Sequence, residues 1–309
     1  KLPNALIAIE KILKIICLLI FSHCGRSAKL RVIPRNTIQN NSRMRRLKMR
    51  MLRRNALSFL TCMPIAAAAG GASVATAAVP EEKPKTSGKI LFVVTSHGEL
   101  GNTGRKTGYW LSEVTHPWKV LKDAGYEIDF VSPLGGECPS EGIDASDPIN
   151  KEFSQDLSAQ KKINFTMKPS DVKPDEYKAI FFAGGHGVMW DFPDNKELAA
   201  ITSKIYENGG VVAAVCHGPA GLVNVKLSNG KYLVEGKKIN SFTNSEEKGI
   251  GLDKVVPFAL ETALVKHGAK FQCSDNFQSH VVVNDRVITG QNPMSAMAVG
   301  AAIRTALQN

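Results

Sequence analysis

The chain has 309 residues, enough for one large domain or two ordinary ones, and its 43% hydrophobic and 22% charged residues are typical of a globular protein. The net charge of +11 is concentrated at one end, because residues 78–309 hold only 25 of the 39 basic residues but 27 of the 28 acidic ones. The part expected to fold is therefore slightly acidic and offers no basic surface to a phosphate backbone, which excludes nucleic-acid binding.

Residues 1–77 are interpreted as a leader rather than as part of the fold. A basic segment at 45–54 precedes an uncharged apolar run, rich in Ala and Gly, at 56–79. Small residues directly before Ala78 suit signal peptidase, so we expect cleavage there and export of the rest of the chain. A retained membrane anchor and an organellar transit peptide are the alternatives, and residues 1–43 fit an over-extended gene start.

A linker is expected at 78–88, followed by a single catalytic domain at 89–309. Residues 89–95 form a short apolar run that ends in polar residues, which is typical of a buried parallel strand. A helix is predicted at 108–125, where apolar residues recur at helical spacing. Pro117 is expected to kink or interrupt this helix.

A second strand at 126–131 leads into a polar, acidic segment at 132–173, which is too long for a plain connection and is expected to be partly helical. Beyond it, apolar strands alternate with helices. The predicted order is strand 179–183, helix 196–208, strands 211–215 and 238–243, helix 257–267, strands 281–283 and 286–289, and helix 295–307. This alternation predicts an α/β protein, a three-layer sandwich with a mainly parallel sheet.

The strongest chemical signal is Cys216, which follows the apolar strand at 211–215 and precedes His217-Gly218-Pro219. Ligand sites of open α/β sheets lie at the carboxyl ends of strands, and small residues let a tight turn hold a nucleophile clear of the sheet. A helix beginning near Gly218 would point unpaired N–H groups at the sulfur and favour the reactive thiolate. A buried structural cysteine is the alternative.

The segment Gly184-Gly185-His186-Gly187 ends the preceding strand in a similar way. Glycines there let a backbone N–H point into a site and stabilise an oxyanion. Gly185 and the amide of His217 are predicted to supply the two donors. Alone this signal is weak, because glycines after a strand often serve only a turn.

Together these segments resemble the ThiJ/PfpI superfamily, the class I glutamine amidotransferase-like group, and within it the glyoxalase III and Hsp-type chaperone branch. The resemblance also rests on Glu113 with His116-Pro117 and on the closing segment 290–296, Gly-Gln-Asn-Pro-Met-Ser-Ala, and it spans nearly all of 89–309. It implies a flavodoxin-like sandwich, a homodimer and no cofactor. It also implies conversion of methylglyoxal or related aldehydes to hydroxy acids without glutathione.

The resemblance implies roles for four residues. Cys216 matches the nucleophile, His217 the adjacent histidine, and Glu113 the acid that hydrogen-bonds the sulfur. Glu247 matches the carboxylate that orients the histidine, with Glu246 as a competitor one residue away. Because a carboxylate beside a thiolate is repulsive unless it is protonated, Glu113 should have a raised pKa and transfer protons.

Two other function classes stay open: a stress chaperone with a vestigial site, and a cysteine peptidase or amidase that uses the same residues. The resemblance also implies protein deglycation as an alternative activity. The expected partner is a small aldehyde, and membrane contact is expected only through an uncleaved leader. No metal is expected, because His97, Glu99 and His116 lack a recognised ligand spacing and suit loop roles better. Export leaves open a disulfide between Cys138 and Cys273.

Overall fold

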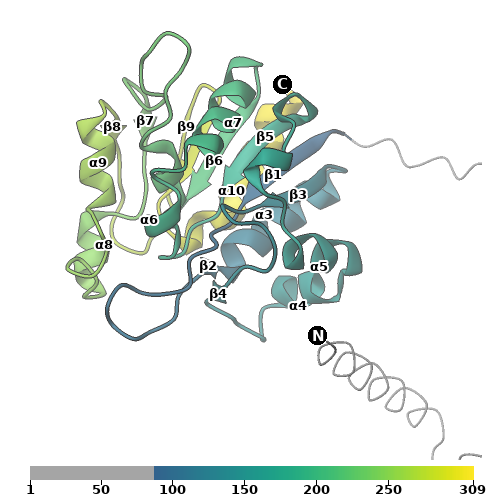
Figure 1. The fold of residues 1–309 in the computed structure, drawn as a ribbon, viewed down its shortest axis with the longest axis horizontal. Helices are drawn as coiled ribbons and strands as arrows, with labels where there is room; N and C mark the ends of the chain where they lie inside the picture. The colour runs from purple at the N-terminus through teal and green to yellow at the C-terminus, as the bar shows by residue number, and fades with distance from the viewer. Residues whose placement is uncertain (1–86) are drawn as a thin grey trace, which may run out of the picture. The chain divides into compact units, whose positions relative to one another are not determined.

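The computed structural model describes residues 87–309, so the predicted leader and nearly all of the predicted linker lie outside the described residues. The centre of the described part is a six-stranded sheet (Figure 1). Its strands follow the order β3 (Glu127–Val131), β1 (Lys89–Val93), β5 (Tyr177–Phe182), β6 (Val211–Val215), β10 (Val287–Gly290) and β9 (Val281–Asn284). Five strands are parallel, and β9 pairs with β10 in the antiparallel direction. The predicted three-layer α/β sandwich is confirmed, and its five parallel strands have the flavodoxin-like order.

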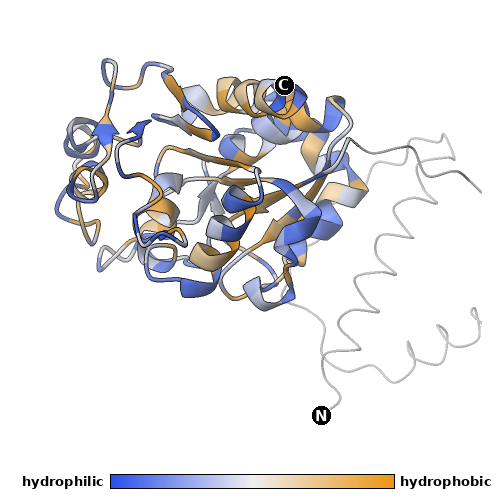
Figure 2. Cartoon of the chain, turned by 90° about the horizontal axis from the view of Figure 1, so that it is seen from above, coloured by the Kyte–Doolittle hydropathy of each residue, from blue (hydrophilic) through white to orange (hydrophobic). Residues whose placement is uncertain are grey.

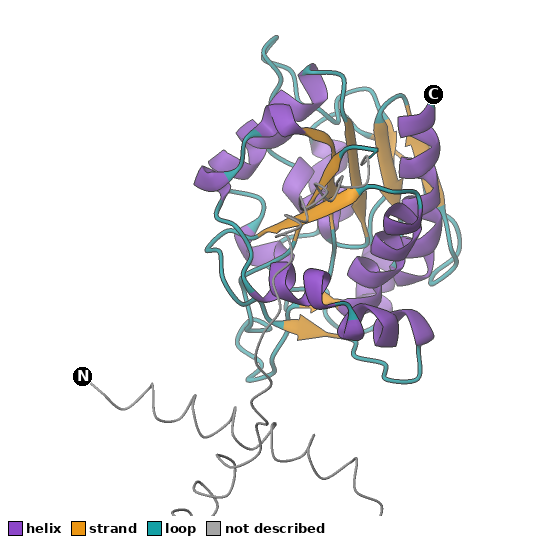
Figure 3. Cartoon of the chain, turned by 90° about the vertical axis from the view of Figure 1, so that its right-hand side faces the viewer, coloured by secondary structure: helices purple, strands orange, loops and turns teal. Residues whose placement is uncertain are grey.

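Helices cover both faces of this sheet (Figure 3). The helices that contribute to the core on one face are α3 (Leu111–Asp123), α4 (Pro148–Gln155), α5 (Leu157–Asn164) and α10 (Ala296–Gln308). Those that contribute to the core on the other face are α6 (Val188–Asp191), α7 (Lys196–Glu207) and α9 (Leu260–Lys266). None of the helices within the described residues has the length and hydrophobicity needed to cross a membrane.

Short elements complete the described part. Two pairs of two-residue strands lie outside the central sheet: β2 (Tyr109–Trp110) with β4 (Ser140–Glu141), and β7 (Lys238–Ile239) with β8 (Lys270–Phe271). Helix α8 covers Asn244–Gly249. The 3-10 helices are η1 (Pro169–Asp171), η2 (Pro174–Glu176), η3 (Gly218–Leu222) and η4 (Pro293–Ser295).

The two-residue periodicity of β1 explains why the protein has two cores. Ile90 and Phe92 belong to the core beneath α3 and α10, whereas Leu91 and Val93 belong to the core beneath α7. All four side chains are fully buried. The strands of the central sheet are accordingly mainly hydrophobic (Figure 2). Each such side chain contributes about 1.5–3 kcal/mol when it is removed from water.

Two expectations about local structure differ from what is found, and a third is confirmed. Helix α3 runs through Pro117 without a break, and the close approach of Gly300 on α10 to Pro117 packs the two helices together. The strand predicted at 238–243 is limited to β7, because Thr243 caps α8 instead: its hydroxyl accepts the N–H of Glu246. The segment 132–173 is partly helical, as predicted, and contains α4 and α5.

The fold brings the predicted site residues to one edge of the sheet. In a parallel sheet the carboxyl ends of the strands meet at the same edge. The turns after β5 and β6 therefore lie next to one another, and the register pairs Phe182 of β5 with Ala214 of β6. Helix α3 brings Glu113 to the same place, where it is fully buried.

Candidate active site

Cys216 lies on a tight turn at the end of β6, in a backbone conformation that is rare for its type. Its φ is 59°, in the left-handed region that favours glycine. The turn is held on both sides, because the Cys216 N–H donates to Gly290 O at 2.9 Å and Phe242 N–H donates to Cys216 O at 2.7 Å. A nucleophile elbow has this geometry, which presents the side chain beyond the strand.

The resting state of the sulfur differs from the sequence-based expectation. The predicted helix is the five-residue 3-10 helix η3, too short for the dipole argument. Burial, and then the neighbouring Glu113, raise the pKa of the Cys216 thiol well above its usual range, although the His217 N–H acts in the opposite direction. The raised pKa favours a protonated thiol at rest in place of the expected thiolate, so the thiol gives up its proton as it reacts.

His217 is placed to take that proton. Its Nδ1 lies 3.4 Å from Cys216 Sγ, and its Nε2 lies 2.7 Å from Glu247 Oε2. Burial, and then the positive charge of His186, lower the pKa of His217 although Glu247 opposes them, so the ring is neutral at neutral pH. These partners assign the tautomer: Nε2–H donates to Glu247, and the Nδ1 lone pair faces the sulfur.

The geometry separates the two adjacent carboxylates. Glu247 faces His217, whereas Glu246 points to the other side of α8 and is fully buried. The Glu246 carboxylate accepts hydrogen bonds from Thr243 N, Thr243 Oγ1, Phe277 N and Asn292 Nδ2, at 2.8–3.0 Å. Glu246 therefore joins three loops, and Glu247 is the carboxylate that contacts the histidine.

Glu113 lies against the sulfur with one oxygen satisfied and the other free. Its Oε2 accepts the N–H of Gly184 at 2.8 Å, and its Oε1 is buried without a hydrogen-bond partner among residues 87–309. Burial raises the pKa of Glu113 to about 8, although the Cys216 thiol and the Gly184 N–H act in the opposite direction. At neutral pH the carboxyl is therefore mainly protonated. Because Oε2 is an acceptor, the proton belongs on Oε1, where it can be donated.

The two glycines after β5 are required by close contacts. A Cβ on Gly184 would lie 2.6 Å from Glu113 Oε2 and 2.8 Å from His217 N. Gly185 has a φ of +101°, and a Cβ there would lie 2.3 Å from Gly108 O. Within residues 87–309 neither the Gly185 N–H nor the His217 N–H donates to a carbonyl oxygen. Their use as an oxyanion hole stays a prediction.

Two further residues, His186 and Glu141, belong to the site and were not found from the sequence. His186 Nε2 lies 3.1 Å from Glu247 Oε1, its Nδ1 lies 3.8 Å from Glu141 Oε1, and its ring lies 4.3 Å from that of His217. His186 is in the glycine motif, where only the glycines were interpreted. Glu141 lies 45 residues before His186, in a segment without a motif, so no local signal could have indicated it.

One group of described side chains is compact enough to be considered for a metal ion. His186, His217 and Glu247 each offer a ligand atom, and these atoms lie within 4.8 Å of one another. Each of these atoms is already hydrogen-bonded to another member of the group, so we interpret the group as one that handles protons.

The other histidines and cysteines singled out from the sequence lie apart from this group. His97 Nε2 lies 2.7 Å from Glu99 O, within its own loop, and His116 pairs with Asp147 at 2.7 Å. Among the described cysteines Cys138 and Cys273 are both free, and the structure contains no disulfide between them. Cys138 and Cys273 are therefore separate thiols in this structure, and the disulfide left open by the sequence is not formed.

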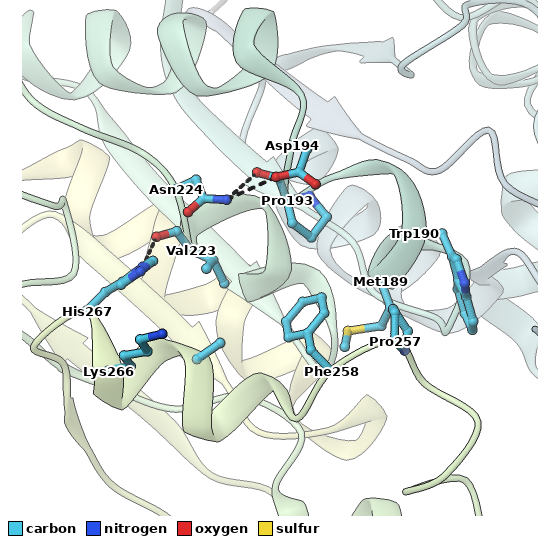
Figure 4. A pocket seen from close by; sticks show the side chains of 11 residues that line it. Met189, Trp190, Pro193, Asp194, Val223, Asn224, Pro257, Phe258, Lys266 and His267 are labelled. Carbon is cyan, nitrogen blue, oxygen red and sulfur yellow. Dashed lines mark hydrogen bonds between the residues drawn. The ribbon is translucent and has the colours of Figure 1, made fainter.

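One hollow reaches a residue of the site, and a larger one does not. A hollow of about 290 Å³ reaches Glu247 and Phe242, whose ring lies 4.6 Å from that of His217. A larger hollow of about 360 Å³ is lined by Met189 and Phe258, among others, and includes none of the predicted site residues (Figure 4).

Comparison with known proteins supports the resemblance seen in the sequence. A family model described as the DJ-1/PfpI family matches residues 106–306. The chain is 35% identical over 235 residues to the glutathione-independent glyoxalase HSP31 of Saccharomyces cerevisiae, covering 72% of this chain and 98% of that protein. It is 32% identical over 238 residues to glyoxalase 3 of Candida albicans, covering 71% and 98%.

Two solved structures are also similar. The crystal structure of glyoxalase III from Candida albicans has a TM-score of 0.66 and 30% sequence identity, covering 71% of this chain and 97% of that one. The Rapid Encystment Protein 24 KDa of Francisella tularensis has a TM-score of 0.69 and 43% identity, covering 72% and 100%. The chain belongs to the DJ-1/PfpI family.

Proposed function

We propose that this protein is a glutathione-independent glyoxalase, which converts methylglyoxal or a related reactive aldehyde to a hydroxy acid through Cys216. The observation that carries the proposal is the placement of two proton-transfer groups next to one sulfur. His217 Nδ1 lies 3.4 Å from Sγ, and the buried acid Glu113 contacts the same thiol. The similarity to glyoxalases over most of their length supports the same activity.

The first step is addition of the thiol to the aldehyde. Cys216 Sγ attacks the aldehyde carbon while its proton passes to His217 Nδ1, and Glu113 gives its proton to the carbonyl oxygen. The product is a hemithioacetal, with Glu113 ionised and His217 protonated. Glu247, held against His217 Nε2 at 2.7 Å, stabilises the imidazolium that forms.

The second step moves a hydrogen between the two substrate carbons. C1 is the former aldehyde carbon, now bonded to sulfur, and C2 is the ketone carbon. The Glu113 carboxylate removes the proton from C1, and His217 protonates the ketone oxygen, which gives an enediol. Glu113 then returns a proton to C2 while the C1 hydroxyl proton passes to His217. The result is a thioester. C1 is oxidised and C2 is reduced within one molecule, so no external oxidant is needed.

Hydrolysis completes the cycle. Water attacks the thioester, its proton passes to Glu113, and the departing sulfur takes a proton from His217. The hydroxy acid is released and all three groups return to their starting protonation states. A pKa of about 8 suits Glu113 for this alternation, because a proton-transfer group works best when its pKa is near the working pH.

The test is lactate formation from methylglyoxal by the full chain, without glutathione and in the presence of a chelator. We expect saturable lactate formation that is unchanged by added glutathione. Absence of lactate, together with cleavage of a peptide substrate or suppression of the aggregation of another protein, would reject the proposal in favour of a peptidase or a chaperone.

We also propose that the protein is exported and that it is a homodimer. The basic and apolar segments at 45–79 support export, and the family resemblance supports the dimer. The mass and N-terminus of the purified mature protein would test cleavage before Ala78, and light scattering would test the dimer.

A further inference from the structure

We propose that His186 and Glu141 are positioning residues of this site: His186 holds the Glu247 carboxylate against His217, and Glu141 holds His186. This inference rests on the proposed function, in which His217 must accept the thiol proton. It deepens that function by extending the proton-handling group from three residues to five.

The geometry around Glu247 is the first observation. Its two oxygens are divided between two imidazoles: Oε2 lies 2.7 Å from His217 Nε2, and Oε1 lies 3.1 Å from His186 Nε2. A carboxylate held at both oxygens cannot rotate away from either partner. Its orientation toward His217, and with it the tautomer of His217, therefore depends on His186.

The second observation is the anchoring of His186 from the opposite side. Glu141 Oε1 accepts the Thr107 hydroxyl at 2.9 Å and the backbone N–H of His186 at 3.1 Å, and it lies 3.8 Å from His186 Nδ1. Glu141 is on β4, which pairs with β2, and Trp110 of β2 donates its N–H to Gly184 O at 3.0 Å. The β2–β4 pair thus ties Glu141 to the turn that carries His186.

The third observation is the balance of charge. The titratable groups that face His186 are Glu141 from β4, Glu247 from α8, His217 after β6 and, more distantly, Glu113 from α3. Burial alone would lower the pKa of His186, but Glu141 and Glu247 outweigh it and raise the pKa to about 9. Burial would raise the pKa of Glu247, but its contacts with His186 and His217 outweigh burial and lower the pKa to about 2. At neutral pH His186 is therefore an imidazolium between two carboxylates.

The charge on His186 has a direct effect on His217. With the rings 4.3 Å apart, a positive His186 disfavours a second positive charge, and it contributes to the lowered pKa of His217. His217 is thereby kept neutral, with its Nδ1 lone pair facing Cys216. This is the state in which it can accept the thiol proton.

The experiment compares the wild-type full chain with His186→Gln, which keeps a hydrogen-bond donor but removes the positive charge. The readouts are kcat and KM for methylglyoxal, and the rate of alkylation of Cys216 by iodoacetamide as a function of pH. We expect kcat to fall tenfold or more at pH 7 with KM within about twofold, because substrate contacts remain. We expect the pH profiles of kcat and of the alkylation rate both to move to higher pH by about one unit. The loss of a positive charge raises the pKa of His217 and of Cys216, so both groups keep their protons to a higher pH.

The control is His116→Gln, which removes a part-buried histidine–carboxylate pair away from the site, His116 with Asp147. It should leave both profiles in place. A His186→Gln variant that loses activity equally at every pH, with unshifted alkylation, would overturn the proposal and leave His186 a structural role. Shifted alkylation in a protein without glyoxalase activity would reject the proposed function and keep this inference.

A second variant covers the case in which His186→Gln does not fold. Glu141→Gln removes one of the two negative charges that face His186. Titration of ¹⁵N-labelled histidines by NMR should show the pKa of His186 near 9 in the wild type and at least one unit lower in Glu141→Gln. A wild-type His186 that titrates near its ordinary value of about 6.5 would overturn the proposal.

Discussion

The proton on Glu113 determines at which pH the site can work. The carboxyl is fully buried, its Oε2 is used by the Gly184 N–H, and its pKa is raised to about 8. Below this pH the group is a donor aimed at the sulfur and at any substrate bound to it. Above it the group is an anion that repels the developing thiolate of Cys216.

The first prediction concerns the pH dependence of the wild-type enzyme. Because the reaction starts with protonated Glu113, kcat/KM should fall as the pH rises through about 8. The measurement is kcat/KM for methylglyoxal from pH 5 to 10, corrected for uncatalysed loss of the aldehyde. A rate that keeps rising beyond pH 9 would contradict a protonated Glu113 as the starting acid.

The second prediction separates the two adjacent carboxylates. Glu247→Gln should lower kcat by about 10- to 1,000-fold, because a neutral amide cannot stabilise the protonated form of His217. Glu246→Gln should instead destabilise the fold by about 1–3 kcal/mol, because the buried carboxylate accepts four hydrogen bonds. Its kcat per folded molecule should stay within about tenfold of wild type. Urea unfolding and kcat, measured on both variants, check this, and the reverse pattern would contradict the assignment.

These residues also show what the sequence can predict about a site. Cys216 carries its own signal, because strand, nucleophile and turn are contiguous. The choice between Glu246 and Glu247 has no local answer: neighbouring residues on a helix point about 100° apart, and the capping of α8 by Thr243 decides which one faces His217. Glu141 meets His186 only through the tertiary fold, so no pattern within its own segment could indicate it.

At the scale of elements, the turn after β5 and helix α3 form one unit. Gly184 lies where the Glu113 carboxylate and the His217 backbone both approach, so this position has no room for a side chain. The third prediction is that Gly184→Ala displaces Glu113 and lowers kcat at least 100-fold, an effect comparable to the loss of a general acid. The variant should still fold, because the sheet beneath is unchanged.

Gly249→Ala is the matched control for this variant. Gly249 lies at the end of α8, has no positive φ, and a Cβ there would be at least 3.9 Å from its neighbours. Its kcat should match wild type within about twofold. Equal kcat in Gly184→Ala and Gly249→Ala would show that the close contact between position 184 and the Glu113 carboxylate does not position that carboxylate for catalysis.

The elements that the sequence predicts well are those with a long or fully apolar pattern. Strands β1, β5 and β6 and helices α7 and α10 lie within a few residues of their expected bounds. The two-residue strands β2 and β4 have no period to detect: β2 lies within the segment predicted as a helix at 108–125, and β4 within the long segment that was expected only to be partly helical. The β2–β4 pair positions Glu141, which holds His186. The sequence therefore missed the part of the site that depends on strands too short to show a periodic pattern.

At the scale of the whole molecule, the site affects how stability depends on pH. His186 has a folded-state pKa raised to about 9, so its contribution is complete below its unfolded value and is lost as the pH rises toward 9. Glu113 acts in the same direction, because its raised pKa means that the folded state holds a proton that the unfolded chain has lost. Glu247, with a pKa of about 2, stabilises the fold above its unfolded value and loses this effect in acid.

The fourth prediction follows from these signs. The free energy of unfolding should fall between about pH 6 and pH 9 by on the order of 5 kcal/mol, with roughly half of it from each of His186 and Glu113. Urea titrations at both pH values measure this, and the fall should be smaller in Glu113→Gln, where one of the two groups no longer titrates. A free energy of unfolding that rises over this interval would contradict the raised pKa values of His186 and Glu113 in the folded state.

Cys216 and a protonated Glu113 together carry out the chemistry in this mechanism, and one assay on matched variants measures the contribution of each. Lactate formation from methylglyoxal without glutathione is compared in wild type, Cys216→Ala and Glu113→Gln, with the exposed residues Cys273→Ala and Glu137→Gln as matched controls. We predict no enzymatic lactate from Cys216→Ala, at least a 100-fold loss in Glu113→Gln, and wild-type rates in both controls. Wild-type turnover by Cys216→Ala, or an unchanged rate in Glu113→Gln, would contradict the account.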